Sequence, residues 1–196
     1  MLSSSVSGRS GPATTVSTPA RTLEVIHGRQ GHESMAILLP GRPHELNLAE
    51  NRELLAAETA ELDGVVAIEG AAQLLDDLFS VPHGLVTSAT KDLAVARMGA
   101  AGLRIPDLCV TAEDVHRGKP HPEAFLLAAA SLGVDPADCI VVEDSANGIV
   151  AGIRAGMRVL GVGPHAEHAG PTWTVESVAA CRVTATDDGI VLSLAG

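Results

Sequence analysis

The spacing of apolar residues along the chain changes its period near residue 65. Between residues 22 and 63 apolar side chains recur at helical intervals, as at Leu48, Leu55 and Leu62, and no run resembles a strand. Beyond Val65 short apolar runs alternate with longer amphipathic segments. This change predicts a small helical unit followed by an α/β unit.

The second unit is predicted in some detail. Strands are expected at 84–87, 108–111, 139–143 and 158–162, and helices at 69–79, 91–101, 123–132 and after Ser145. Alternation of this kind predicts a Rossmann-like parallel sheet with right-handed crossovers and helices on its faces. Near the C-terminus, Asp187-Asp188-Gly189 between two β-like runs predicts a hairpin.

The first 21 residues have a different texture. They are rich in Ser, Thr, Gly and Pro, lack the apolar centre of a signal peptide, and are predicted to be a disordered tail. Helices at 33–39 and 45–62 follow, separated by Pro40-Gly41-Arg42-Pro43. The expected organisation is therefore a tail at 1–21, a helical unit at 22–64 and an α/β core at 65–196.

Composition limits the partners. Thirteen Lys and Arg against 24 Asp and Glu give a net charge of −11, which argues against nucleic acid or an anionic membrane as a partner. No apolar run is long enough to cross a bilayer. The three cysteines are far apart in the sequence and are expected to be reduced thiols in a cytoplasmic protein.

Two adjacent carboxylates, Glu143 and Asp144, directly follow the strongest predicted strand. Ligands of open α/β sheets bind just beyond the carboxyl ends of the strands. Neighbouring carboxylates repel each other unless a cation lies between them, and Mg²⁺ prefers such oxygen donors. The pair therefore indicates a Mg²⁺ site, although an acid that caps the next helix is the simpler alternative.

Other strand ends carry groups that suit a phosphate. Ser88 and Ala89 follow the strand at 84–87 and precede a helix, whose first N–H groups can hold phosphate oxygens. Lys119 lies in a loop with Pro120 and Pro122 and offers a fixed ammonium. Singly, Ser88 could be a plain helix cap and Lys119 a surface lysine. Together with the carboxylate pair they indicate phosphoryl chemistry, which needs a phosphate cradle, a cation and a metal.

These segments resemble three motifs of the haloacid dehalogenase (HAD) superfamily. The resemblance rests on Thr87-Ser88-Ala89-Thr90, on Arg117-Gly118-Lys119-Pro120 and on Val142-Glu143-Asp144-Ser145-Ala146-Asn147-Gly148, and it covers residues 65–162. It is strongest to the sugar- and polyol-phosphate phosphatases and β-phosphoglucomutase-like members. It implies a HAD-like core with Ser88, Ala89 and Lys119 on phosphate, Glu143 and Asp144 on Mg²⁺, and a small phosphorylated metabolite as substrate.

The helical unit resembles the rear part of the cap that these enzymes carry. Within it, His27-Gly28-Arg29 and Glu33 match a segment that faces substrate in such enzymes. The alternative is a solvated turn, because a cation gains nothing from the start of a helix.

The sequence departs from the family at its nucleophile. The family's Asp-x-Asp-Gly-Thr motif is absent, and Asp63-Gly64 lies where the cap joins the core. The resemblance puts the first strand in mid-sheet, between the strands that end at Ser88 and Glu143. We expect that strand to be missing, and residues 13–18 not to take its place. Unpaired strand edges would then favour oligomerisation.

Three hypotheses follow from the sequence. The first is a Mg²⁺-dependent phosphatase whose front end is lost, truncated or misassigned, and which is inactive as written because its nucleophile and acid/base Asp are absent. The second is a non-catalytic HAD-like protein that binds phosphate or metal or serves in a complex. The third is a metal-free dehalogenase, which the Glu143–Asp144 pair disfavours.

Overall fold

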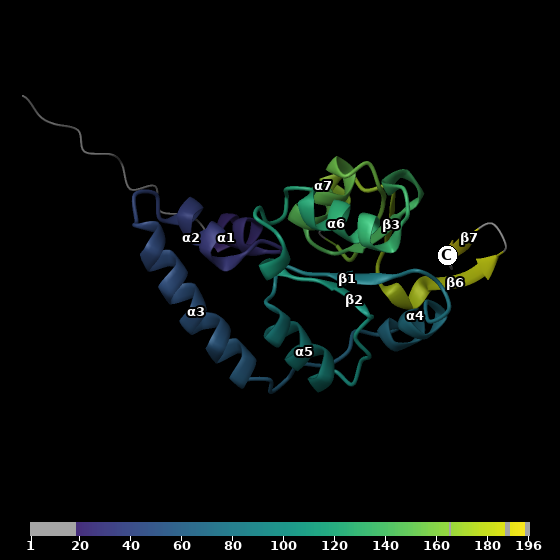
Figure 1. The fold of residues 1–196 in the computed structure, drawn as a ribbon, viewed down its shortest axis with the longest axis horizontal. Coiled ribbons are helices and arrows are strands. Elements are labelled where there is room, and N and C mark those ends of the chain that lie inside the picture. The colour runs from purple at the N-terminus through teal and green to yellow at the C-terminus, as the bar shows by residue number, and fades with distance from the viewer. Residues whose placement is uncertain (1–18, 165, 187–188, 195–196) are drawn as a thin grey trace, which may run out of the picture.

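A computed structural model of the protein describes residues 19–164, 166–186 and 189–194 (Figure 1). The predictions for residues 1–18, including the strand candidate at 13–18, lie outside these residues. No helix in the described ranges is long and apolar enough to cross a membrane.

The helical unit has three helices. They are α1 (Pro19–Ile26), α2 (Gly31–Leu38) and α3 (His44–Ala60). Residues 19–21, which the sequence assigned to the tail, therefore belong to a helix. The long α3 packs on α2 and also contacts α5 (Figure 1). Glu58 of α3 and Arg97 of α5 form an ion pair of 3.1 Å.

The α/β unit follows the predicted alternation. Its helices are α4 (Ala71–Asp77), α5 (Lys91–Ala100), α6 (Glu123–Leu132) and α7 (Ala146–Arg154). Short 3₁₀ turns occupy Ala112–Asp114, Pro136–Asp138, Glu167–Ala169 and Val178–Ala180. The hydroxyl of Thr90 accepts a hydrogen bond from the N–H of Leu93 and so caps α5, while Gly133 ends α6 in the left-handed conformation.

In the part of the chain that the structure describes, the strands form three separate sheets. β1 (Gly84–Val86) pairs in parallel with β2 (Leu108–Val110). β3 (Ile140–Glu143), β4 (Arg158–Val162) and β5 (Trp173–Val175) form a second parallel sheet. β6 (Cys181–Thr186) and β7 (Gly189–Leu194) form the predicted antiparallel hairpin.

The α/β class with parallel strands is therefore confirmed, but the single continuous sheet is not observed. β1 has β2 as its partner and β3 has β4, so no strand in the described residues joins the two parallel sheets. Backbone groups on the facing edges of β1 and β3 consequently lack ladder partners. The two sheets are separate because no strand in the described residues lies between β1 and β3; both strands themselves form where the sequence predicts them.

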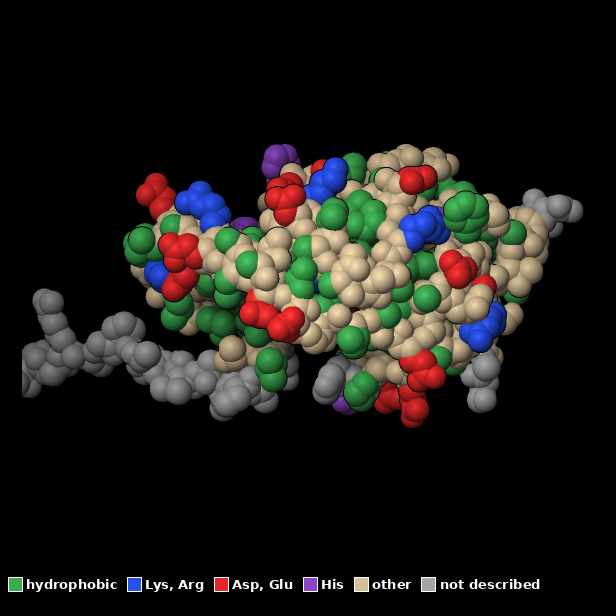
Figure 2. Space-filling model, turned by 90° about the horizontal axis from the view of Figure 1, so that it is seen from below, with side chains coloured by type: hydrophobic (Ala, Val, Ile, Leu, Met, Phe, Trp, Pro, Cys, Tyr) green, Lys and Arg blue, Asp and Glu red, His purple; other side chains and the backbone are tan. Residues whose placement is uncertain are grey.

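The main core lies where α7 packs against β3 and β4, with α6 beside α7. Ile149 and Val159 are fully buried there, and Phe125 of α6 belongs to the same cluster. Cys181 is buried and the other two cysteines are half-buried, all as free thiols. On the face seen in Figure 2, apolar side chains are interspersed with acidic ones rather than gathered in one sheet-wide patch.

Candidate functional site

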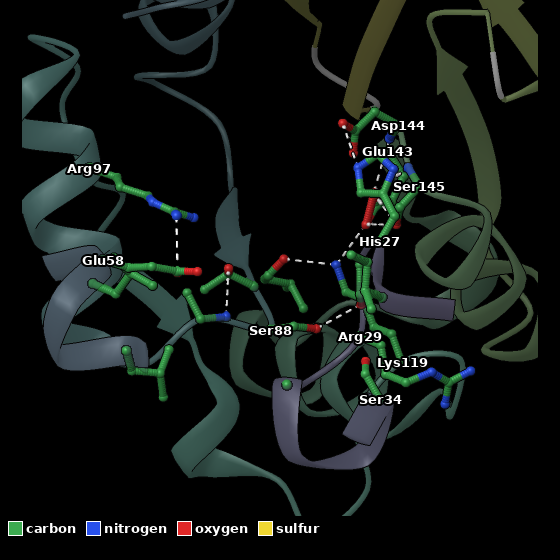
Figure 3. Close-up of a pocket in the computed structure, with 18 of the residues that line it drawn as sticks. His27, Arg29, Ser34, Glu58, Ser88, Arg97, Lys119, Glu143, Asp144 and Ser145 are labelled. Carbon is green, nitrogen blue, oxygen red and sulfur yellow. Dashed lines mark hydrogen bonds and ion pairs between the residues drawn. The ribbon is translucent and has the colours of Figure 1, made fainter. Parts of the chain in front are cut away.

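A cavity of about 940 Å³ lies at the ends of β1 and β3 (Figure 3). Its lining includes seven of the eight site residues predicted from the sequence: His27, Arg29, Ser88, Ala89, Lys119, Glu143 and Asp144. The eighth, Glu33, lies beside it on α2. The folded chain thus gathers around one space residues that lie up to 117 positions apart (144 − 27) in the sequence.

Lys119 connects the two parallel sheets. Its Nζ donates to the carbonyl of Val86 at the end of β1 (3.1 Å) and to Oε1 of Glu143 at the end of β3 (2.7 Å). The ammonium also lies 4.9 Å from the centre of the Phe125 ring. With side-chain exposures of 7% and 10%, Lys119 and Glu143 form a buried ion pair.

Glu143 is held from several sides. Its Oε2 accepts hydrogen bonds from the N–H of Asp144 (3.0 Å) and of Ser145 (3.3 Å). Burial by itself would raise the pKa of this carboxyl, but the Lys119 ammonium and these N–H donors outweigh burial and hold the pKa below its usual range. Gly148 allows this arrangement, because a Cβ there would overlap the carboxylate.

The Asp144 carboxylate is exposed and can bind a cation, whereas the Glu143 carboxylate is already paired with the Lys119 ammonium. The Asp144 side chain is 67% exposed, and its Oδ2 lies 3.5 Å from Nε2 of His27. Mg²⁺ is usually held by one or two carboxylates together with waters and phosphate oxygens. Asp144 fits that role, while metal binding by Glu143, which stays a prediction, would compete with Lys119. The described residues contain no cluster of three or more metal-ligating side chains.

Ser88 lies at the entrance to α5. Its Oγ donates to the carbonyl of Gly28 (2.9 Å), so the hydroxyl points at the turn between α1 and α2 (Figure 3). In the first turn of α5, the N–H of Lys91 already donates to the Glu113 carboxylate (2.8 Å) and the N–H of Leu93 donates to the Thr90 hydroxyl. Phosphate binding by Ser88 and Ala89 stays a prediction, for which the structure provides the Ser88 hydroxyl on the cavity wall.

The cap residues are tied to the core. Arg29 donates from Nη2 to Oδ1 of Asn147 (3.0 Å). Oε1 of Glu33 accepts from the N–H of Gly118 (3.0 Å), next to Lys119, and its Oε2 is buried without a hydrogen-bond partner. The turn at His27-Gly28-Arg29 connects α1 to α2 and contacts the residues at the strand ends, while the His27 side chain stays 55% exposed.

Sequence reasoning missed two residues that organise the site. Ser145 caps α7 by accepting from the N–H of Gly148 and also donates to Glu143. Asn147 contacts the cap turn through both ends of its amide. Both residues belong to the Val142–Gly148 motif. The partners of Asn147 lie in the turn at residues 27–29, and Arg29 is 118 residues away in the sequence, so the motif alone does not reveal them.

The sequence of the chain is similar to those of known proteins. Residues 20–156 match the family described as haloacid dehalogenase-like hydrolase. Hexitol phosphatase A of Escherichia coli is 40% identical over 151 residues, which cover 76% of this chain and 70% of that protein. Validoxylamine A 7'-phosphate phosphatase of Streptomyces hygroscopicus subsp. limoneus is 35% identical over 153 residues, with coverages of 69% and 72%.

Solved structures show the same fold. A β-phosphoglucomutase from Clostridium difficile superimposes with a TM-score of 0.72 at 25% identity, covering 84% of this chain and 78% of that one. A HAD family hydrolase from Deinococcus radiodurans, crystallised with bound phosphate and sodium, gives a TM-score of 0.57 at 29% identity, with coverages of 75% and 69%.

Proposed function

Because the chain belongs to the haloacid dehalogenase-like hydrolase family, we propose that it carries the binding site of a phosphatase for small phosphorylated sugars or polyols. One observation carries this proposal. Ser88, Lys119 and Asp144, from three different strand ends or loops, line a single cavity. A hydroxyl, an ammonium and a carboxylate around one space are what a phosphate ester and its counter-ion require.

Each group has a distinct role in this proposal. The Ser88 hydroxyl binds a phosphate oxygen, and the Lys119 ammonium balances the charge of the phosphate. Two relatives, hexitol phosphatase A and validoxylamine A 7'-phosphate phosphatase, support the sugar or polyol class. His27, Arg29 and Glu33 on the cap face the non-phosphate part of the substrate.

We also assign a Mg²⁺ ion to this site. Asp144 would hold it, with phosphate oxygens and water as the remaining ligands. When bound, the ion would neutralise charge on the phosphoryl group. A cytoplasmic location and association through unpaired strand edges stay predictions.

We further propose that the 196-residue sequence does not turn over substrate by itself. It contains no Asp-x-Asp-Gly-Thr sequence, and within the described residues no carboxylate takes the place of the nucleophile between β1 and β3. Without a carboxylate to attack phosphorus and a second to protonate the leaving oxygen, the site binds but does not cleave.

A turnover assay tests the proposal. The chain is incubated with a hexitol phosphate and Mg²⁺ beside a version carrying an apolar strand with Asp-x-Asp-Gly-Thr at its N-terminus, and released phosphate is measured. We expect release from the extended protein alone. Equal release from both would contradict the assignment of inactivity. Phosphate release that a chelator does not reduce would contradict the assignment of Mg²⁺ to the site, and halide release from a haloacid would instead support the dehalogenase class.

A non-catalytic protein is the second candidate, favoured by the absent nucleophile motif. The two functions differ in the same assay. A non-catalytic protein would bind phosphate with or without the added strand, and neither version would release phosphate from a sugar ester.

A further inference from the structure

One side chain of the core, Asn147, makes two hydrogen bonds to the turn between α1 and α2, residues 27–29, which lines the cavity. Nδ2 of Asn147 donates to the carbonyl of His27 (2.7 Å), and Oδ1 of the same amide accepts from Nη2 of Arg29 (3.0 Å). A carbonyl only accepts and a guanidinium only donates, so the two partners fix the orientation of the amide. We infer that Asn147 is a positioning residue, which fixes this turn and the Arg29 side chain at the cavity.

The other contacts of the turn are made by two core side chains that a ligand would also bind. Ser88 donates to the carbonyl of Gly28, and Asp144 lies 3.5 Å from His27. The inference rests on the proposed function here, because that function gives Ser88 to phosphate and Asp144 to Mg²⁺. Once a ligand occupies both, the two hydrogen bonds of Asn147 are the described side-chain contacts that still tie the turn to the core.

The local backbone explains why the turn docks so closely. Gly28 has a φ of +76°, and a Cβ at this position would overlap the side chain of Ser145. The turn therefore lies directly on the first residues of α7. The amide of Asn147, in the first turn of that helix, reaches two groups of the turn at once.

The role of Asn147 is separable from the stability of α7. The helix start is capped by Ser145, whose hydroxyl accepts from the N–H of Gly148 at 3.0 Å. Removing the Asn147 amide leaves this cap in place. Arg29 matters because the molecule carries a net charge of −11, so each cation near the cavity must be held where an anionic substrate binds.

Amide hydrogen exchange of the intact chain tests the inference. Asn147→Ala is compared with the wild type, with Ile153→Ala, an exposed change on the same helix, as the control. Without ligand, we expect exchange of the His27 and Arg29 amides to quicken by about tenfold in Asn147→Ala, because two hydrogen bonds are lost. Exchange of amides 149–153 of α7 should be unchanged. If Asn147 only stabilised the helix, exchange of these amides would quicken as well.

A second variant distinguishes the effect of the hydrogen bond to His27 from that of the hydrogen bond to Arg29. Asn147→Asp keeps an acceptor for Arg29 and loses the donor to His27, so exchange should quicken less than in Asn147→Ala. With Mg²⁺ and inorganic phosphate added, the wild-type turn should stay protected, and the Asn147→Ala turn should lose its remaining protection.

The outcomes separate the two proposals. Equal exchange at residues 27–29 in the wild type and Asn147→Ala without ligand would overturn the role of Asn147, whatever the site binds. If phosphate and Mg²⁺ change nothing in any variant and produce no binding heat, the proposed function fails, while the ligand-free comparison still decides the role of Asn147.

Discussion

At the scale of single residues, the Lys119–Glu143 pair organises the site. The two side chains are buried, and their ion pair joins the ends of two sheets that no ladder hydrogen bond connects. A buried charge is costly when its partner is removed, while loss of both charges costs much less. The pair is thus a structural connection as well as a proposed source of the phosphate counter-charge.

A double-mutant cycle measures this connection. Lys119→Met should lower the free energy of unfolding by about 3 kcal/mol, because the Glu143 carboxylate then remains buried without its ammonium. Adding Glu143→Gln should restore at least about 1 kcal/mol of that loss. Urea denaturation of the two single variants and the double variant provides the values. Strictly additive losses would show that the two charges are not coupled.

The pH dependence of stability has a definite sign. Because the pKa of Glu143 is lower in the folded protein than its ordinary value of 4.5, the unfolded chain binds more protons as the pH falls. This contribution to stability is complete above about pH 4.5 and is lost as the pH drops through the folded pKa. Denaturation at a series of pH values should therefore show a steeper acid decline for the wild type than for Glu143→Gln. A matching decline in both would refute the assignment.

At the scale of elements, two glycines in helices differ in how closely other side chains pack against them. Gly148 in α7 faces the Glu143 carboxylate, whereas Gly99 in α5 has open space around its Cα. Gly148→Ala should destabilise the protein by roughly 1–3 kcal/mol through overlap. Gly99→Ala should stabilise it by roughly 0.5–1 kcal/mol, because alanine is the better helix former.

Thermal unfolding of these two variants provides the comparison. A loss in both would mean that α5 is packed more tightly than the structure indicates. A gain in both would mean that the Glu143 carboxylate does not lie against α7.

Most elements were predictable because their signals are local. The helix at 123–132 ends at Gly133, the strand at 158–162 is bounded by turn residues, and both were placed at their observed limits. The helix α1 was missed because it is only eight residues long and adjoins a Ser- and Thr-rich stretch that shows no period. Asn147 was missed for another reason, since its partners are distant in sequence.

At the scale of the whole molecule, the cavity lies between two half-sheets. Their order along the chain, and the polar residues at their ends, follow from alternation and could be predicted. Within the described residues, no strand joins β1 to β3. The ion pair across the gap could not be predicted, because sequence spacing does not show which strand ends lie within reach of Lys119.

Calorimetric titration of the folded chain with inorganic phosphate in the presence of Mg²⁺ tests the central claim most directly. We predict binding at one site, weakened by at least about tenfold in Ser88→Ala and in Lys119→Met, because each removes a donor to phosphate. The exposed change Ser131→Ala on α6 serves as the control and should bind as the wild type does. Absence of heat from a folded sample, or equal binding by all four proteins, would contradict the assignment of this cavity to phosphate.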